Sequence, residues 1–163
     1  MKELTDPEIR ESFVNCTKGE VGRITVPRDL PDFPWADLDF LGWRDPGAPN
    51  RSYIVAEHDG QLVGFALRLA SRSAGSHHRT MCSICLTTHP ASGVTLMTAR
   101  KARQSGNGGD TVGEYICSNL ACSLYVRGKK RTQPGGRLKE SLTEEEKVDR
   151  MKTKLAAFLD TLL

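Results

Sequence analysis

Four short segments of the chain have the composition of β-strands. Residues 52–57 (SYIVAE) and 61–69 (QLVGFALRL) are rich in β-branched and apolar side chains, and Asp59-Gly60 lies between them. An Asp-Gly pair between two such runs is the strongest short-range hairpin signal, because a type I′ turn needs positive φ at both central positions. Two further runs, 93–98 and 111–116, flank a glycine-rich connection. The pattern predicts an antiparallel sheet that includes one hairpin.

Helical periodicity occurs near the two ends of the chain. The run Thr5-Asp6-Pro7 resembles an N-cap followed by a first-turn proline, which predicts a short helix over roughly 6–16. Near the other end, Thr143 and Glu146 form a capping box. The segment 143–162 then carries apolar residues on one helical face, which are Val148, Met151, Leu155, Phe158, Leu159 and Leu162. We therefore expect a C-terminal amphipathic helix.

Prolines, glycines and aromatic residues crowd the segment 19–50 without a clear period. We interpret this segment as an extended arm whose aromatic side chains pack on the sheet, with a ligand groove as the alternative. The expected organisation is an N-terminal helix with a proline-rich arm over 1–50 and a second domain over 51–163. The fold class that these elements predict is α+β.

Composition limits the class of protein. The chain has 163 residues, of which 38% are hydrophobic and 26% charged, as expected for one globular domain with appendages. Residues 1–10 do not resemble a signal peptide. The longest uncharged run, 80–99, contains Ser, Thr, His and Pro, which argues against a membrane span. We expect a cytoplasmic protein with no membrane partner.

Charge is distributed unevenly along the chain. Residues 61–137 carry 11 Lys/Arg against 2 Asp/Glu, a balance of +9, whereas residues 1–60 carry 7 against 12. This asymmetry favours an anionic partner for the middle segment, either a nucleic acid or an acidic protein surface.

Four of the five cysteines form two pairs, Cys82-x₂-Cys85 and Cys117-x₄-Cys122, separated by 31 residues. Two such pairs can supply the closed tetrahedral thiolate shell that Zn²⁺ prefers in structural sites. Redox chemistry and ordinary buried cysteines are the alternatives. Cys16 stands alone in the sequence, and we interpret it as a small core residue of the first helix.

The order of the elements is that of a treble-clef zinc finger. A Cys-x₂-Cys turn is followed by two strands, and the second cysteine pair follows the second strand. A helix that begins near Ser118 would place Cys122 in its first turn, facing Cys117. The sequence therefore predicts an antiparallel sheet with a treble-clef zinc finger.

Histidines close to the cysteines raise two further hypotheses. His77, His78 and His89 could each replace a cysteine ligand, although four cysteines already complete the shell. A treble clef with histidines is also found in HNH nucleases, but His89 is preceded by Thr87-Thr88 and not by the Asp of that motif. No cluster of acid, base and nucleophile is evident, so we expect neither an enzyme nor a small-molecule substrate.

Four segments together resemble a known family. They are 12–19 (SFVNCTKG), 40–46 (FLGWRDP), 81–90 (MCSICLTTHP) and 117–128 (CSNLACSLYVRG). The chain is similar to the actinobacterial branch of the elongation factor G-binding proteins, the family of the fusidic acid resistance proteins. This resemblance implies a treble-clef domain with Zn²⁺ on Cys82, Cys85, Cys117 and Cys122.

The resemblance also implies a partner, elongation factor G, and an effect on its release from the ribosome and on fusidic acid sensitivity. Two runs of basic residues flank the cysteine pairs, with an aromatic residue between them. The candidate partner-binding residues are Arg100, Lys101, Arg103, Tyr125, Arg127, Lys129, Lys130 and Arg131. Binding of ribosomal RNA, or of another nucleic acid, is the alternative function.

Overall fold

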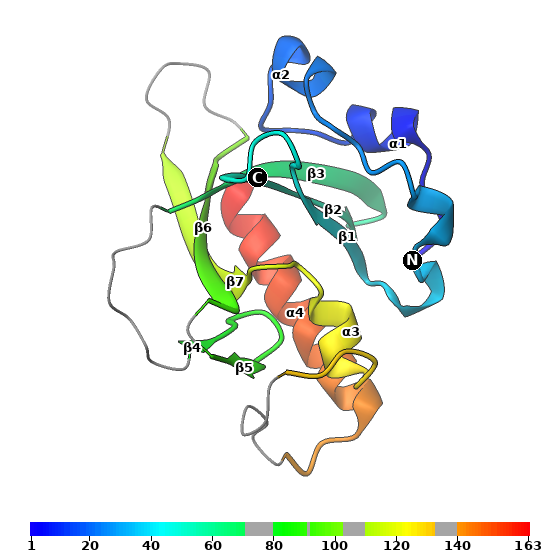
Figure 1. Ribbon diagram of the computed structural model, residues 1–163, viewed down its shortest axis with the longest axis vertical. Helices are drawn as coiled ribbons and strands as arrows, with labels where there is room; N and C mark the ends of the chain where they lie inside the picture. Colours follow the sequence, from blue (N-terminus) through cyan, green and yellow to red (C-terminus); the bar gives the residue numbers. More distant parts are fainter. Residues whose placement is uncertain (71–79, 91, 103–109, 133–139) are drawn as a thin grey trace.

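A five-stranded antiparallel sheet forms the centre of the molecule (Figure 1). The computed structural model describes residues 1–70, 80–90, 92–102, 110–132 and 140–163. The strands of the sheet are β1 (Phe40–Arg44), β2 (Arg51–His58), β3 (Gln61–Leu69), β6 (Val94–Arg100) and β7 (Thr111–Cys117), in the spatial order β1-β2-β3-β6-β7. A separate two-stranded sheet contains β4 (Thr80–Met81) and β5 (Thr88–His89). The predicted α+β fold with an antiparallel sheet is confirmed.

The β2–β3 hairpin is the one that the sequence predicted. Its turn residues, Asp59 and Gly60, have φ values of 49° and 74°. Both values lie in the left-handed region that a type I′ turn requires, and Asp and Gly tolerate this region better than most residues. The turn therefore fixes the register in which His58 pairs with Gln61.

Side chains alternate between the two faces of the sheet, and each face has its own core. In β2, Ile54 and Ala56 pack with the cysteines and with helices α3 (Cys122–Val126) and α4 (Glu144–Leu162). The intervening Tyr53 and Val55 pack with the N-terminal segment instead. The sheet is thus the middle of three layers, with α4 and the N-terminal segment on opposite sides.

The N-terminal layer contains two short helices, α1 (Asp6–Glu11) and α2 (Lys18–Gly22), and two 3₁₀ turns, η1 (Leu30–Asp32) and η2 (Trp35–Asp37). The predicted helix over 6–16 is therefore too long. After Glu11 the backbone bonds with β3: Val14 N–H donates to Gly64 O at 3.0 Å, and Gly64 N–H donates to Ser12 O at 2.8 Å. These bonds across the sheet replace further helical turns.

Within the segment predicted to be an extended arm, residues 40–44 form the edge strand β1. Phe40 belongs to the core beneath α4, and Leu41 and Trp43 belong to the opposite core. A strand that buries side chains on both faces lacks the alternation that identifies a half-buried strand. The aromatic side chains nevertheless pack as expected, because the Trp43 and Tyr53 rings lie 5.0 Å apart.

Helix α4 follows the predicted pattern closely. Thr143 is its N-cap and forms a reciprocal capping box with Glu146. The residues that it buries are Met151, Leu155, Phe158, Leu159 and Leu162, all on the predicted face. Within the ranges that the structure describes, no helix combines the length and the apolar content needed to cross a bilayer.

Candidate metal centre

The first cysteine pair lies in a tight turn between β4 and β5. Cys82 N–H donates to Thr87 O at 3.0 Å, and Leu86 N–H donates to Cys82 O at 2.9 Å. Leu86 has a φ of 55°, in the left-handed region, which reverses the chain directly after Cys85. The turn brings the sulfurs of Cys82 and Cys85 to the same side.

The second pair joins a strand end to a helix start. Cys117 is the last residue of β7, and Cys122 is the first residue of α3. Leu120 has a φ of 55° and donates its N–H to Cys117 O at 2.8 Å, so the intervening loop folds back on itself. The expectation that Cys122 lies in the first turn of a helix is confirmed.

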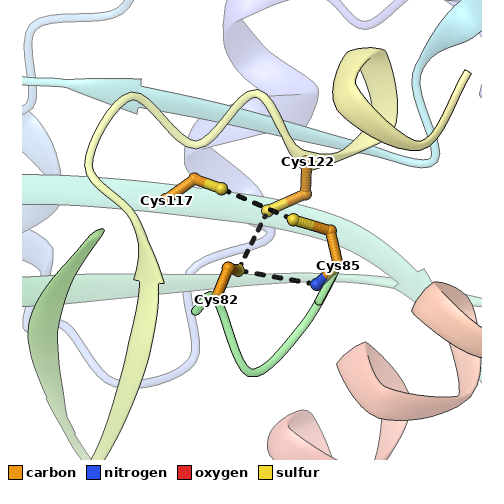
Figure 2. Close-up of side chains that lie close together, drawn as sticks. All are labelled: Cys82, Cys85, Cys117 and Cys122. Atoms are coloured by element: carbon orange, nitrogen blue, oxygen red, sulfur yellow. Dashed lines mark hydrogen bonds between the residues drawn. The ribbon is translucent and has the colours of Figure 1, made fainter. Parts of the chain in front are cut away.

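The four sulfurs converge on one point, as Figure 2 shows. The sulfur–sulfur distance is 3.7 Å for Cys82 and Cys122, and 3.5 Å for Cys85 and Cys117. All four sulfurs lie within 4.8 Å of one another. A tetrahedral shell with Zn–S bonds of about 2.3 Å separates its sulfurs by about 3.8 Å. The spacing in the structure therefore fits a four-coordinate Zn²⁺ site.

The charge balance of the cluster also favours a cation. All four cysteines are buried. Hydrogen bonding with Cys117, Cys82 and Cys85, together with burial, raises the pKa of Cys122 well above its ordinary value. Four buried thiolates would repel one another strongly, and a divalent ion removes much of that cost by stabilising the deprotonated sulfurs. The donor set thus suits a structural zinc ion.

His89 contacts the cluster from outside the four-sulfur shell. Its Nε2 lies 3.3 Å from the Cys117 sulfur, and the residue is only 4% exposed. Burial lowers the pKa of His89, which favours the neutral ring. A neutral His89 with its proton on Nε2 donates to this sulfur, and Cys85 N–H donates to the Cys82 sulfur at 3.5 Å.

The sequence suggested His89 as a substitute ligand or as the histidine of a nuclease motif, and it did not predict this contact. Gly93 explains part of it, since a Cβ at that position would lie 2.3 Å from the His89 Cβ. In the sequence, Gly93, three residues after Pro90, was the signal that could have indicated this close packing around His89. His77 and His78 lie outside the described residues.

Cys16 is remote from the metal centre. It lies beyond the end of α1, and it packs against the N-terminal core on the other face of the sheet. Burial raises the pKa of its thiol to about 11. The residue is thus a partly buried, unreactive thiol of the N-terminal layer, and the interpretation that placed it on the first helix is wrong.

Three of the candidate partner-binding residues form ion pairs within the chain. Arg127 makes a bidentate pair with Asp39, and Lys129 Nζ lies 2.7 Å from Asp37. Both acids belong to the segment that leads into β1. Arg100 Nη2 lies 2.8 Å from the carboxylate of Glu20 in α2. The N-terminal acids therefore neutralise part of the predicted basic surface.

The remaining candidates differ in exposure. Tyr125 is 8% exposed, and its ring packs edge-on against His89 at 4.7 Å between centroids. Lys130 and Arg131 are exposed at the end of α3, whereas Lys101 is half-buried. Arg103 lies outside the described residues.

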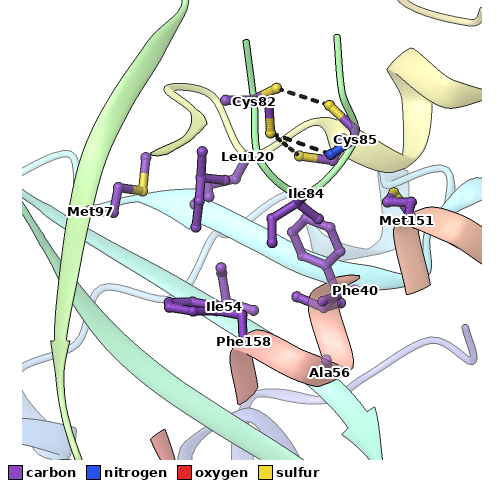
Figure 3. Packing of buried hydrophobic residues seen from close by; sticks show 14 of the residues in the cluster. Phe40, Ile54, Ala56, Cys82, Ile84, Cys85, Met97, Leu120, Met151 and Phe158 are labelled. Carbon is purple, nitrogen blue, oxygen red and sulfur yellow. Dashed lines mark hydrogen bonds between the residues drawn. The ribbon is translucent and has the colours of Figure 1, made fainter. Parts of the chain in front are cut away.

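The metal centre is continuous with the main core (Figure 3). Ile84, between the first two cysteines, is buried in the same cluster as Met151 and Phe158 of α4. Leu120, between the other two, packs on Gly42 of β1 so closely that a Cβ on the glycine would lie 2.6 Å from the leucine Cβ. The cysteine loops therefore form part of the packing between α4 and the sheet.

Comparison with known families agrees with this site. The family described as the FBP C-terminal treble-clef zinc-finger matches residues 8–162, which is nearly the whole chain. It is a zinc-finger domain of a binding protein and not a known enzyme family. No curated protein matches the chain significantly. With its four clustered cysteines and its extensive match, the chain belongs to the FBP C-terminal treble-clef zinc-finger family.

Proposed function

We propose that this chain is a non-catalytic protein that binds translation elongation factor G. In this proposal Cys82, Cys85, Cys117 and Cys122 hold a Zn²⁺ ion whose role is structural. The observation that carries the proposal is the match of residues 8–162 to a zinc-finger domain of the FBP binding proteins. The resemblance of the cysteine segments to elongation factor G-binding proteins supports the same partner.

The contact surface that we favour lies at the end of α3. Lys130 and Arg131 are exposed there, directly after the helix that begins at Cys122. Two interactions fix the position of this helix: the cysteine cluster at its start and the Arg127–Asp39 pair beyond its last turn. A positively charged surface on such a fixed element needs little reordering when a partner binds.

The other predicted residues have supporting roles in this proposal. Tyr125 packs under α3 against His89, so its ring supports the surface from within. Arg127 and Lys129 hold α3 against Asp39 and Asp37. Arg100 and Lys101, by contrast, are not part of the surface at the end of α3, because Arg100 pairs with Thr111 at the end of the β6–β7 ladder opposite to the Val94–Cys117 pair.

The test compares the parent protein with a Lys130→Glu/Arg131→Glu variant. Both proteins, loaded with zinc, are titrated against fluorescently labelled elongation factor G. We expect the variant to bind at least about tenfold more weakly, mainly through slower association, because opposite charges steer the encounter. Raising the salt concentration should slow association of the parent, because the Debye length falls from about 10 Å at 0.1 M to about 3 Å at 1 M.

A matched control reverses two cations elsewhere. Lys152 and Lys154 are exposed on α4, so Lys152→Glu/Lys154→Glu makes the same change in net charge away from α3. This control should bind elongation factor G like the parent. Equal affinities of parent and Lys130→Glu/Arg131→Glu variant would show that the end of α3 is not the contact surface. Absence of binding by the parent would refute the partner itself.

We infer a cellular role from the same partner. A protein that binds elongation factor G acts in the cytoplasm and can help to release the factor from the ribosome. Expression of the chain in a fusidic acid-sensitive bacterium should then raise the drug concentration that stops growth. The Lys130→Glu/Arg131→Glu variant should have a weaker effect at equal protein abundance.

A further inference from the structure

Within the described ranges of the chain, nothing covers one face of the sheet at its β6–β7 end. The N-terminal layer packs on this face over β1, β2 and β3, as the second core shows. In Figure 1, α1 and α2 lie beside β3, away from β7. The cysteines and α4 cover only the opposite face. Part of the sheet surface therefore remains exposed beside the N-terminal layer.

The pairing register identifies the side chains on this exposed surface. Arg51 pairs with Arg68, Arg68 pairs with Thr98, and Thr98 pairs with Gly113, which gives one row across four strands. Residues two positions away along a strand share the same face. The open sheet face, as we define it, contains Arg51, Arg68, Leu96, Thr98, Arg100, Thr111, Gly113 and Tyr115.

Tyr115 provides an accessible aromatic ring on the open sheet face. It is 51% exposed, whereas Tyr53 and Tyr125 are buried. Gly113 lies beside it, with no side chain above the sheet. A Cβ at Gly113 would lie 3.1 Å from both Leu96 Cδ1 and Thr98 Cγ2. Because the glycine has no side chain, these two methyl groups form a shallow apolar surface next to the Tyr115 ring. A planar group can lie on this surface and stack on the tyrosine.

Arginines provide positive charge on the same face. Arg51 and Arg68 are exposed, and neither forms an ion pair with any residue in the described part of the chain. Arg100 is paired with Glu20, yet its side chain is 50% exposed. These three arginines contribute to a cavity of about 70 Å³ between α2 and the sheet. The open sheet face thus has unpaired cations close to an exposed ring.

This combination is typical of single-stranded nucleic-acid binding. Exposed bases stack on aromatic side chains of an open sheet, while basic side chains contact the phosphates. Strands in a sheet lie about 4.8 Å apart and rise about 3.3 Å per residue, so Arg68 on β3 and Tyr115, two residues beyond its row on β7, are roughly 12 Å apart, within reach of one short strand. A stable protein interface instead needs an apolar centre, and here the large apolar side chains are only Tyr115 and the half-buried Leu96.

We propose that the open sheet face binds a short stretch of single-stranded nucleic acid. Its phosphates contact Arg51 and Arg68, and one base stacks on Tyr115. This activity uses a different surface from the end of α3. It therefore does not depend on the binding of elongation factor G.

The experiment uses the full-length, zinc-loaded protein and fluorescein-labelled oligouridylate and oligothymidylate of about ten nucleotides, within the usual range of site sizes. Fluorescence anisotropy is measured between about 50 and 200 mM salt. We expect binding to weaken steeply with salt. The Arg51→Ala/Arg68→Ala variant should bind more weakly and should lower the slope of log affinity against log salt by about 1.4, or 0.7 for each lost phosphate contact.

The aromatic contact is tested with two substitutions at one position. Tyr115→Ala should lower affinity by about 5- to 150-fold, because it removes the stacking surface. Tyr115→Phe keeps the ring and should bind like the parent. Since Tyr115 is exposed, both variants should keep the zinc content and the thermal unfolding temperature of the parent.

Lys152→Ala/Lys154→Ala on α4 is the charge control, and it should keep the parent's affinity and salt slope. The proposal is overturned if neither oligonucleotide binds, or if Tyr115→Ala binds like the parent. Equal losses in the arginine variant and the α4 control would also overturn it, because binding would then reflect net charge alone.

If the arginine variant loses affinity for elongation factor G while the parent binds no oligonucleotide, the open sheet face is a protein surface. Binding of RNA but not DNA, or of both, supports the proposal and defines its ligand.

Discussion

At the scale of single residues, the contact between His89 and Cys117 is the feature that the cysteine spacing did not reveal. The imidazole Nε2 lies 3.3 Å from the Cys117 sulfur and is enclosed by Tyr125 and Gly93. Groups that hydrogen-bond to a metal ligand orient that ligand and adjust its basicity. His89 therefore helps to fix a thiolate without being one of the four clustered ligands.

We expect His89→Ala to weaken zinc retention by about 10- to 100-fold, the usual effect of removing such a partner. Competition with a chromogenic chelator at neutral pH measures this loss. Cys16→Ser is the control, because Cys16 lies on the other face of the sheet, and it should keep the parent's zinc affinity. Zinc affinity that is unchanged in His89→Ala would mean that this histidine only fills space.

At the scale of elements, the N-terminus of α4 shows how a local signal supports a long-range contact. Thr143 accepts a hydrogen bond from Glu146 N–H at 3.2 Å, and Glu146 accepts one from Thr143 N–H at 2.7 Å. The second bond is the main reason why the pKa of the Glu146 carboxyl is lowered. The helix that begins here buries Met151 and Phe158 against the core that contains the cysteines.

We expect Thr143→Ala to lower the free energy of unfolding by about 1 kcal/mol, because an N-cap hydroxyl is lost. Urea denaturation of the zinc-loaded protein at neutral pH measures the change. Thr143→Ser keeps the hydroxyl and should match the parent to within a few tenths of a kcal/mol. If serine and alanine destabilise the protein equally, the methyl group matters more than the cap.

At the scale of the whole molecule, zinc binding and folding should be inseparable. The four cysteines belong to the same core as Ile84, Leu120 and α4, and that core covers one face of the central sheet. Zinc binding contributes roughly 10–16 kcal/mol in small zinc-finger peptides. This is of the same size as the net stability of about 5–15 kcal/mol that is usual for a domain. The sheet also supports the N-terminal layer, so unfolding should spread to both faces.

Removal of zinc by a chelator under reducing conditions should therefore unfold the protein. Far-ultraviolet circular dichroism follows the sheet and helices. Fluorescence of Trp35 and Trp43, which pack with the N-terminal core, reports whether the opposite layer unfolds as well. Metal analysis should give one zinc per chain before treatment. A metal-free protein with unchanged circular dichroism would contradict this prediction.

The sequence alone was sufficient wherever the determining interactions are local. Asp59-Gly60 predicts its hairpin because its conformation is set within two residues, and Thr143 with Glu146 predicts the start of α4 for a similar reason. The two cysteine pairs predict a shared metal site, since four thiolates at such spacings have few other uses in one chain. These features have a physical cause that can be recognised without knowing the fold.

Only the tertiary structure decided which residues remain accessible. The 6–16 segment offered helical spacing, but hydrogen bonds with β3 end α1 at Glu11. Tyr125 and Tyr115 look alike in sequence, yet the former is buried beside His89 and the latter is exposed on the sheet. The pairing of Arg127 with Asp39 joins positions 88 residues apart. Burial and pairing depend on contacts between distant segments, and local patterns carry little information about such contacts.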